Sequence, residues 1–86
     1  MPIYFFHVCN GNGFTEDKEG RELPDEAAAR SVAVDGARDI MAGEMRVGQL
    51  NPASFIEVED QEHRLLFTLP FSEAYTVNPR PTIERS

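Results

Sequence analysis

The sequence predicts an α+β domain in the order strand, strand, helix, strand, strand, with one mostly antiparallel four-stranded sheet and a single long helix packed on one face. Three observations lead to this prediction. Residues 3–9 (IYFFHVC) are rich in aromatic and β-branched residues, residues 26–47 repeat small and apolar side chains at helical spacing, and residues 54–69 hold two strand-like runs around a polar turn. A helix lying across one sheet face is the simplest way for both elements to bury their apolar surfaces.

The first strand, residues 3–9, is apolar on both sides, which predicts a central position in the sheet. Alternation puts Ile3, Phe5, His7 and Cys9 on one face and Tyr4, Phe6 and Val8 on the other. Residues 10–13 (NGNG) tolerate positive φ and predict a hairpin turn into a short strand around Phe14 and Thr15. Residues 16–20 then read as a solvated acidic turn, after which residues 21–23 resume an extended course.

The helix is predicted from residue 26 to residue 47, with Asp25 as N-cap and Gly48 as the residue that ends it. The predicted buried stripe consists of Ala29, Ala33, Gly36, Ile40, Gly43 and Val47, and it is flanked by Val34, Ala37, Met41 and Met45. At ~1.5 Å per residue the helix would span roughly 33 Å, longer than a six-residue strand of about 20 Å. It therefore either ends early near Gly43 or overhangs the sheet, and an overhang would present Met41 and Met45 as a partner surface.

The second hairpin is predicted to run through residues 54–59, a turn at 60–62 and a return strand at 64–69 that Pro70 ends. Phe71, Ala74 and Tyr75 are expected to pack back against the core, so residues 1–77 form one domain and residues 78–86 a flexible C-terminal tail. The sheet face opposite the helix would leave Phe5 and Phe55 partly exposed, and both are candidate partner-binding residues. Self-association through this face, or through an edge strand, would make a homo-oligomer.

The net charge of the chain indicates which classes of partner it favours. Fifteen acidic and eight basic residues give a net charge of -7, which disfavours nucleic-acid binding by the monomer and favours a basic protein partner. No apolar run approaches the ~20 residues of a membrane span, and no signal peptide is evident, so a cytoplasmic location and no membrane partner are expected. The single cysteine, Cys9, has no partner for an internal disulfide.

The residues most suited to binding a metal are His7 and Cys9, which share a strand face. His63 would complete a set of three ligands that zinc accepts. Nothing in the sequence brings His63 close to His7, and the chain lacks a catalytic constellation or a cofactor motif. The leading hypothesis is a small non-enzymatic protein-binding or regulatory module without a cofactor. The alternative is a metal-binding or redox protein that uses His7 and Cys9.

Several motifs together resemble a family of small bacterial proteins classed only as a domain of unknown function. They are YFFHV at 4–8, N-G-x-G-F at 10–14, D-x-E-G-x-E-L-P-D at 17–25 and, later, IEVED with RLLFTLPFSEA. The likeness covers residues 2–77, implies this fold in a cytoplasmic bacterial setting, and transfers no functional residues. Cys9 stands where the family is expected to carry a polar residue. A looser similarity to HicB-type antitoxins implies neutralisation of a basic toxin, although residues 78–86 are expected to be too few to supply the DNA-binding segment that such proteins usually carry.

Overall fold

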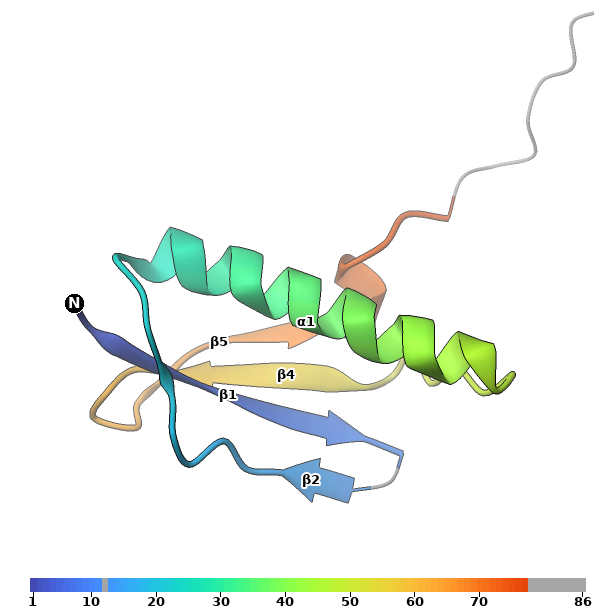
Figure 1. Cartoon of the computed structure of the whole chain (residues 1–86), viewed down its shortest axis with the longest axis horizontal. Helices are drawn as coiled ribbons and strands as arrows, with labels where there is room; N and C mark the ends of the chain where they lie inside the picture. The colour runs from blue at the N-terminus through green and yellow to red at the C-terminus, as the bar shows by residue number, and fades with distance from the viewer. Residues whose placement is uncertain (12, 78–86) are drawn as a thin grey trace, which may run out of the picture.

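The computed structural model describes residues 1–11 and 13–77, and it confirms the predicted element order. The elements are β1 (Ile3–Asn10), β2 (Gly13–Thr15), β3 (Arg21–Glu22), α1 (Glu26–Arg46), β4 (Phe55–Glu59), β5 (Leu65–Pro70) and the short 3-10 helix η1 (Phe71–Glu73). The sheet is antiparallel in the order β2-β1-β4-β5, and α1 crosses one of its faces (Figure 1). The predicted tail, residues 78–86, lies outside the described residues.

Strand β1 is central, as its two apolar faces predicted. One of its edges pairs with β4 along residues 5–9. The other edge pairs with β2 at residues 8–10 and with β3 at residues 3–4, so neither strand pairs with residues 5–7. The partner strand on that side is therefore split into two pieces, and the loop between them lies beside the middle of β1.

Helix α1 has the predicted ends. The Asp25 carboxylate accepts a hydrogen bond from the Ala28 N–H at 2.8 Å, which satisfies one of the free donors of the first turn. At the other end Val47 is the C-cap, and Gly48 adopts a φ of 76° that an L-residue rarely takes. The helix does not end near Gly43, and its last turn extends past the start of β4 in Figure 1.

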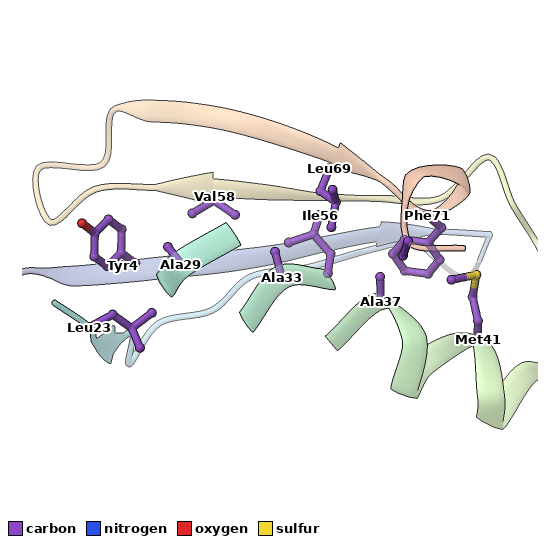
Figure 2. Packing of buried hydrophobic residues seen from close by; sticks show 11 residues of the cluster. Tyr4, Leu23, Ala29, Ala33, Ala37, Met41, Ile56, Val58, Leu69 and Phe71 are labelled. Carbon is purple, nitrogen blue, oxygen red and sulfur yellow. The ribbon is translucent and has the colours of Figure 1, made fainter. Parts of the chain in front are cut away.

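The buried stripe of α1 differs from the predicted one. Its four buried residues follow a strict four-residue spacing: Ala29, Ala33, Ala37 and Met41. Gly36 and Ile40 are only half-buried, while Gly43 and Val47 are exposed, because the helix is rotated toward the flank that the prediction placed beside the stripe. Figure 2 shows Ala29 and Ala33 near the large sheet residues Tyr4, Val58 and Ile56, so small helix residues meet large sheet residues as expected.

The segment that follows β5, including η1, packs against the core. Phe71 is fully buried, and its N–H donates to the Ser54 carbonyl at 2.8 Å. Met41 was predicted to be a partner residue, but only 7% of its surface is exposed. Its side chain points toward Phe71 (Figure 2), so most of it packs in the core instead of forming a partner surface. Ala74 is buried as expected, whereas Tyr75 stays at the surface.

Candidate functional site

The sheet face opposite α1 carries a polar network within aromatic surroundings. Cross-strand register puts Phe5 opposite Glu59, His7 opposite Glu57 and Cys9 opposite Phe55. The sequence prediction of which residues share this face is therefore confirmed. We call it the open face, because α1 packs on the other side of the sheet (Figure 1).

His7 is the buried centre of the open face, with 4% of its surface exposed. The backbone N–H of Asp17 donates to Nδ1 of His7 at 3.0 Å. A backbone N–H is always a donor, so Nδ1 carries no proton and the ring is the Nε2–H tautomer. Nε2 then donates to Oε1 of Glu59 at 2.8 Å, across 52 residues of sequence. Both ring nitrogens of His7 are thus occupied by protein groups.

Glu59 also brings His63 into the network, although the sequence held no sign of this proximity. Nδ1 of His63 lies 3.2 Å from the same Oε1, and the His63 ring stacks on Phe5 at a centroid distance of 4.4 Å. His63 reaches this position from a turn in which its own φ is 64°. The hydrogen bond from His7 holds the pKa of the Glu59 carboxyl below its ordinary value of 4.5, burial opposes this, and His63 adds to the lowering.

Asp17 is the residue that sequence reasoning missed, because the loop at 16–20 was interpreted as a solvated turn. One carboxylate oxygen accepts from the Phe6 N–H at 3.0 Å, in the stretch of β1 that β2 and β3 leave unpaired. The other accepts from Glu19 and Gly20 within the loop. Burial alone would raise the pKa of Asp17, but these three N–H donors outweigh it and hold the pKa below 3.8. The Asp17 side chain thus substitutes for a missing strand partner.

Gly20 is required for the loop to lie this close to β1. Its φ is 74°, and a Cβ at this position would stand 2.6 Å from Cγ2 of Ile3 and 3.0 Å from Cε1 of Phe5. The combination of an aspartate with a glycine three residues later was the available sequence signal, since aspartate side chains readily bond to N–H groups two and three residues on. The D-x-E-G motif therefore has a structural explanation.

The geometry of the open face bears on the metal-binding hypothesis. A metal at His7 would require Nε2 to lose its proton and Glu59 to move away, because neither ring nitrogen offers a free lone pair. Among residues 1–11 and 13–77, no group of three or more histidine, cysteine, aspartate or glutamate side chains is arranged to hold a metal ion. Cys9 is a half-buried free thiol, and the hydrogen bonds of His7 go to Asp17 and Glu59 rather than to this thiol.

A second candidate site lies on the helix side, where α1 extends beyond the sheet. A surface groove of about 280 Å³ is formed there, and almost all of its lining is apolar. We call it the helix-end groove; its lining residues are Arg38, Met41, Ala42, Met45, Leu50 and Tyr75. Met45 is 62% exposed, so the predicted partner residue Met45 does lie at the surface, beside the buried Met41.

Exposed apolar side chains concentrate around this groove. Five of the large exposed hydrophobic residues lie at the end of α1, in the loop between α1 and β4 or in the segment after the sheet: Met45, Val47, Leu50, Tyr75 and Val77. Arg38 links α1 to the segment that follows η1, since its Nε donates to the Ala74 carbonyl at 2.7 Å. On the open face, by contrast, the predicted partner residues Phe5 and Phe55 are half-buried.

A wider hollow of about 670 Å³ lies on the other side of the helix end, between the β1–β2 turn and the segment after α1. Its walls are mixed in polarity, and the Glu44 carboxylate, one of its lining groups, accepts a hydrogen bond from the Asn51 N–H at 3.4 Å. The side chain of Asn51 also lies against Gly11, where a Cβ would stand 2.9 Å from Nδ2. These contacts join the hairpin to the end of the helix.

Comparison with known proteins places the chain in a family without giving it an activity. No helix in the described part of the chain has the length and apolar character needed to cross a membrane. No curated protein and no solved structure matches the chain. One family model does match, over residues 3–72, and its description is a domain of unknown function, DUF6894. Since this match spans both hairpins and the helix between them, the chain belongs to the DUF6894 family.

Proposed function

We propose that this protein is a non-enzymatic binding module whose helix-end groove receives a basic segment of another protein carrying one large apolar side chain. The observation that carries the proposal is the groove itself, an apolar recess with Met45, Leu50 and Tyr75 exposed at its walls. Its volume of about 280 Å³ falls just below the range typical of drug-sized ligands, roughly 300–1,000 Å³. Its almost wholly apolar lining suits one large apolar side chain of a partner.

Charge supports a basic partner. The chain carries a net charge of -7, so its overall field attracts cationic segments and speeds their encounter. Locally, the exposed Asp39 lies one helical turn from Ala42 of the groove, and the exposed Glu73 lies two residues before Tyr75. Arg38, the basic residue in the lining, is already held by Ala74 and lies 4.0 Å from Asp35. A basic toxin would be one partner of this chemistry, so the antitoxin-like role is a special case of the proposal.

The metal-binding or redox alternative depends on His7 and Cys9, which share the open face. The hydrogen bonds of His7 favour a structural role for this residue instead. They join β1, the loop at residues 16–20 and β4 through one buried ring. A partner-binding role for the helix-end groove leaves this network undisturbed.

The test is a selection of random peptides for binding to the full wild-type chain, after which the affinity of the enriched peptides for Met45→Glu is measured. The matched control is Val47→Glu, since Val47 is also a largely exposed apolar residue at the same helix end but is not among the residues that line the groove. We expect enriched peptides to be basic and to share one large apolar residue. Their binding should weaken at least about tenfold, or ~1.4 kcal/mol, in Met45→Glu and stay unchanged in Val47→Glu.

Two results would contradict the proposal. One is the enrichment of peptides without basic residues or an apolar anchor. The other is equal binding of the selected peptides to both variants, since that would place the contact outside the groove. Circular dichroism of both variants checks that the fold is retained, which we expect because each substitution is at an exposed position.

A further inference from the structure

Strand β5 forms an edge of the sheet that lacks the usual protection. In the part of the chain that the structure describes, β5 pairs with β4 alone. Its six residues, LLFTLP, include no charged side chain, Leu65 is 55% exposed and Thr68 is exposed as well. Natural sheets usually blunt such an edge with lysine, with proline or with a covering element, because unpaired N–H and C=O groups invite another strand. Here Pro70 protects only the last position.

We propose that this edge pairs with β5 of a second copy of the chain, in an antiparallel arrangement around a two-fold axis at Thr68. Such self-pairing gives hydrogen-bond partners to the backbone N–H and C=O groups on the β5 edges of both copies. Because the contact is two-fold symmetric, it joins two copies and no more. The sheet would then continue from one copy into the other, with both helices on the same side. The contact uses the outer edge of β5 and none of the residues that line the helix-end groove.

The register follows from the rule that residues directly opposite each other in an antiparallel pair point to the same face. Phe67 and Leu69 lie opposite Val58 and Ile56 in the β4 pairing, so both point toward the helix side. Thr68 lies opposite Glu57 and points to the open face. An axis at Thr68 therefore pairs Thr68 with its own copy and Phe67 with Leu69 of the second copy, so the faces match along residues 67–69.

The neighbouring registers fit less well. An axis at Phe67 would set Leu65 against Leu69, yet Leu65 lies opposite Glu59 on the open face and Leu69 is on the helix side. The mismatch arises from the irregularity between Val58 and Glu59, which shifts the first part of β5 by one residue. An axis at Leu69 would set Thr68 itself against Pro70 of the second copy, which has no N–H to donate, whereas the axis at Thr68 leaves Pro70 to pair with Leu66 at the margin of the ladder.

Charges at the two ends of β5 are complementary in the proposed register. His63 and Arg64, both largely exposed, precede the strand, and the exposed Glu73 follows it. Antiparallel pairing around Thr68 brings the turn that carries His63 and Arg64 near the end of the second copy's β5, where η1 carries Glu73. Since each copy also carries a net charge of -7, overall repulsion opposes these local attractions. We therefore expect a dimer of modest affinity that strengthens as salt screens the net charge.

The experiment measures the molecular mass of the full 86-residue chain by sedimentation from micromolar to near-millimolar concentration. We expect a monomer–dimer equilibrium. Thr68→Lys and Thr68→Glu should each weaken association about five- to tenfold, because the new charges face their own copies across the axis. An equimolar mixture of the two variants should restore the wild-type dimer as a heterodimer. Thr15→Lys, an exposed threonine on the opposite edge strand, is the control and should behave as wild type.

Each other outcome overturns the proposal. A wild-type chain that stays monomeric throughout this range has no such contact. Association unaffected by Thr68→Lys, or lost equally with Thr15→Lys, places the contact elsewhere. A mixture of the lysine and glutamate variants that fails to associate rules out the axis at Thr68. Circular dichroism spectra of the variants separate loss of pairing from loss of the fold.

Discussion

The two faces of the central strand β1 are held in different ways. On the helix side, Tyr4 packs beneath a helix whose buried residues are mostly alanine, and shape fit between small and large side chains supplies the contact. On the open face, His7 is equally buried although α1 lies on the other side of the sheet, and hydrogen bonds with Glu59 and the Asp17 N–H hold its ring in place. One face of the strand is thus stabilised by apolar packing and the other by a polar network with directional requirements.

This difference predicts which substitutions cost most. An apolar core loses contacts and gains a cavity when a large side chain is removed, whereas a network loses one or two hydrogen bonds at a time. The helix side should therefore show the larger losses and little dependence on pH. The open face should show smaller losses that change with pH.

The largest effect is expected for Phe71→Ala on the helix side. Phe71 is fully buried, and its removal should lower the free energy of unfolding by about 3–5 kcal/mol, measured by urea titration. Phe14→Ala is the control on the open face, since Phe14 is 57% exposed and should change stability by less than about 1 kcal/mol. Equal losses in the two variants would show that the helix side is not the main source of stability.

A smaller loss is expected for Asp17→Ala, which removes the acceptor of three backbone N–H groups. The unpaired middle of β1 then has no partner for Phe6, and we expect a destabilisation of about 1–3 kcal/mol. Hydrogen exchange should show faster exchange of the Phe6 and Gly20 amides. Glu16→Ala removes the same charge from the neighbouring exposed residue and should change neither measurement. Unchanged exchange at Phe6 in Asp17→Ala would argue against the role of the carboxylate as a strand substitute.

The smallest effect is the pH dependence of the open face. The folded-state pKa values of Glu59 and Asp17 lie below their ordinary values of 4.5 and 3.8, so each contributes stability that is fully present above its ordinary pKa. This contribution is lost as the pH falls through the lower folded values. Urea titrations between neutral and acidic pH should therefore show a loss of stability that Glu59→Gln reduces. Glu57→Gln removes a carboxylate from the same face of β4, to which neither described histidine is bonded, and should leave the acid loss unchanged.

The element order, the helix ends and the turn glycines could be predicted from short stretches of sequence. Asp25 caps the helix and Gly48 ends it through contacts with residues only a few positions away, so local chemistry is sufficient. The alternation of side chains along β1 and β4 likewise follows from strand geometry alone. The sequence also contained the D-x-E-G motif, although the significance of Asp17 was not apparent without the position of β1.

Only the tertiary structure decided the rest. The rotation of α1 replaced Gly36 and Ile40 by Ala37 and Met41 in the buried stripe, because several small residues on adjacent faces made more than one orientation compatible with the sequence. The meeting of His7, Glu59 and His63 depends on the pairing of β1 with β4, whose residues are some 50 positions apart. Local sequence fixes the backbone conformation of each segment, but the register between distant segments is set by packing across the whole sheet.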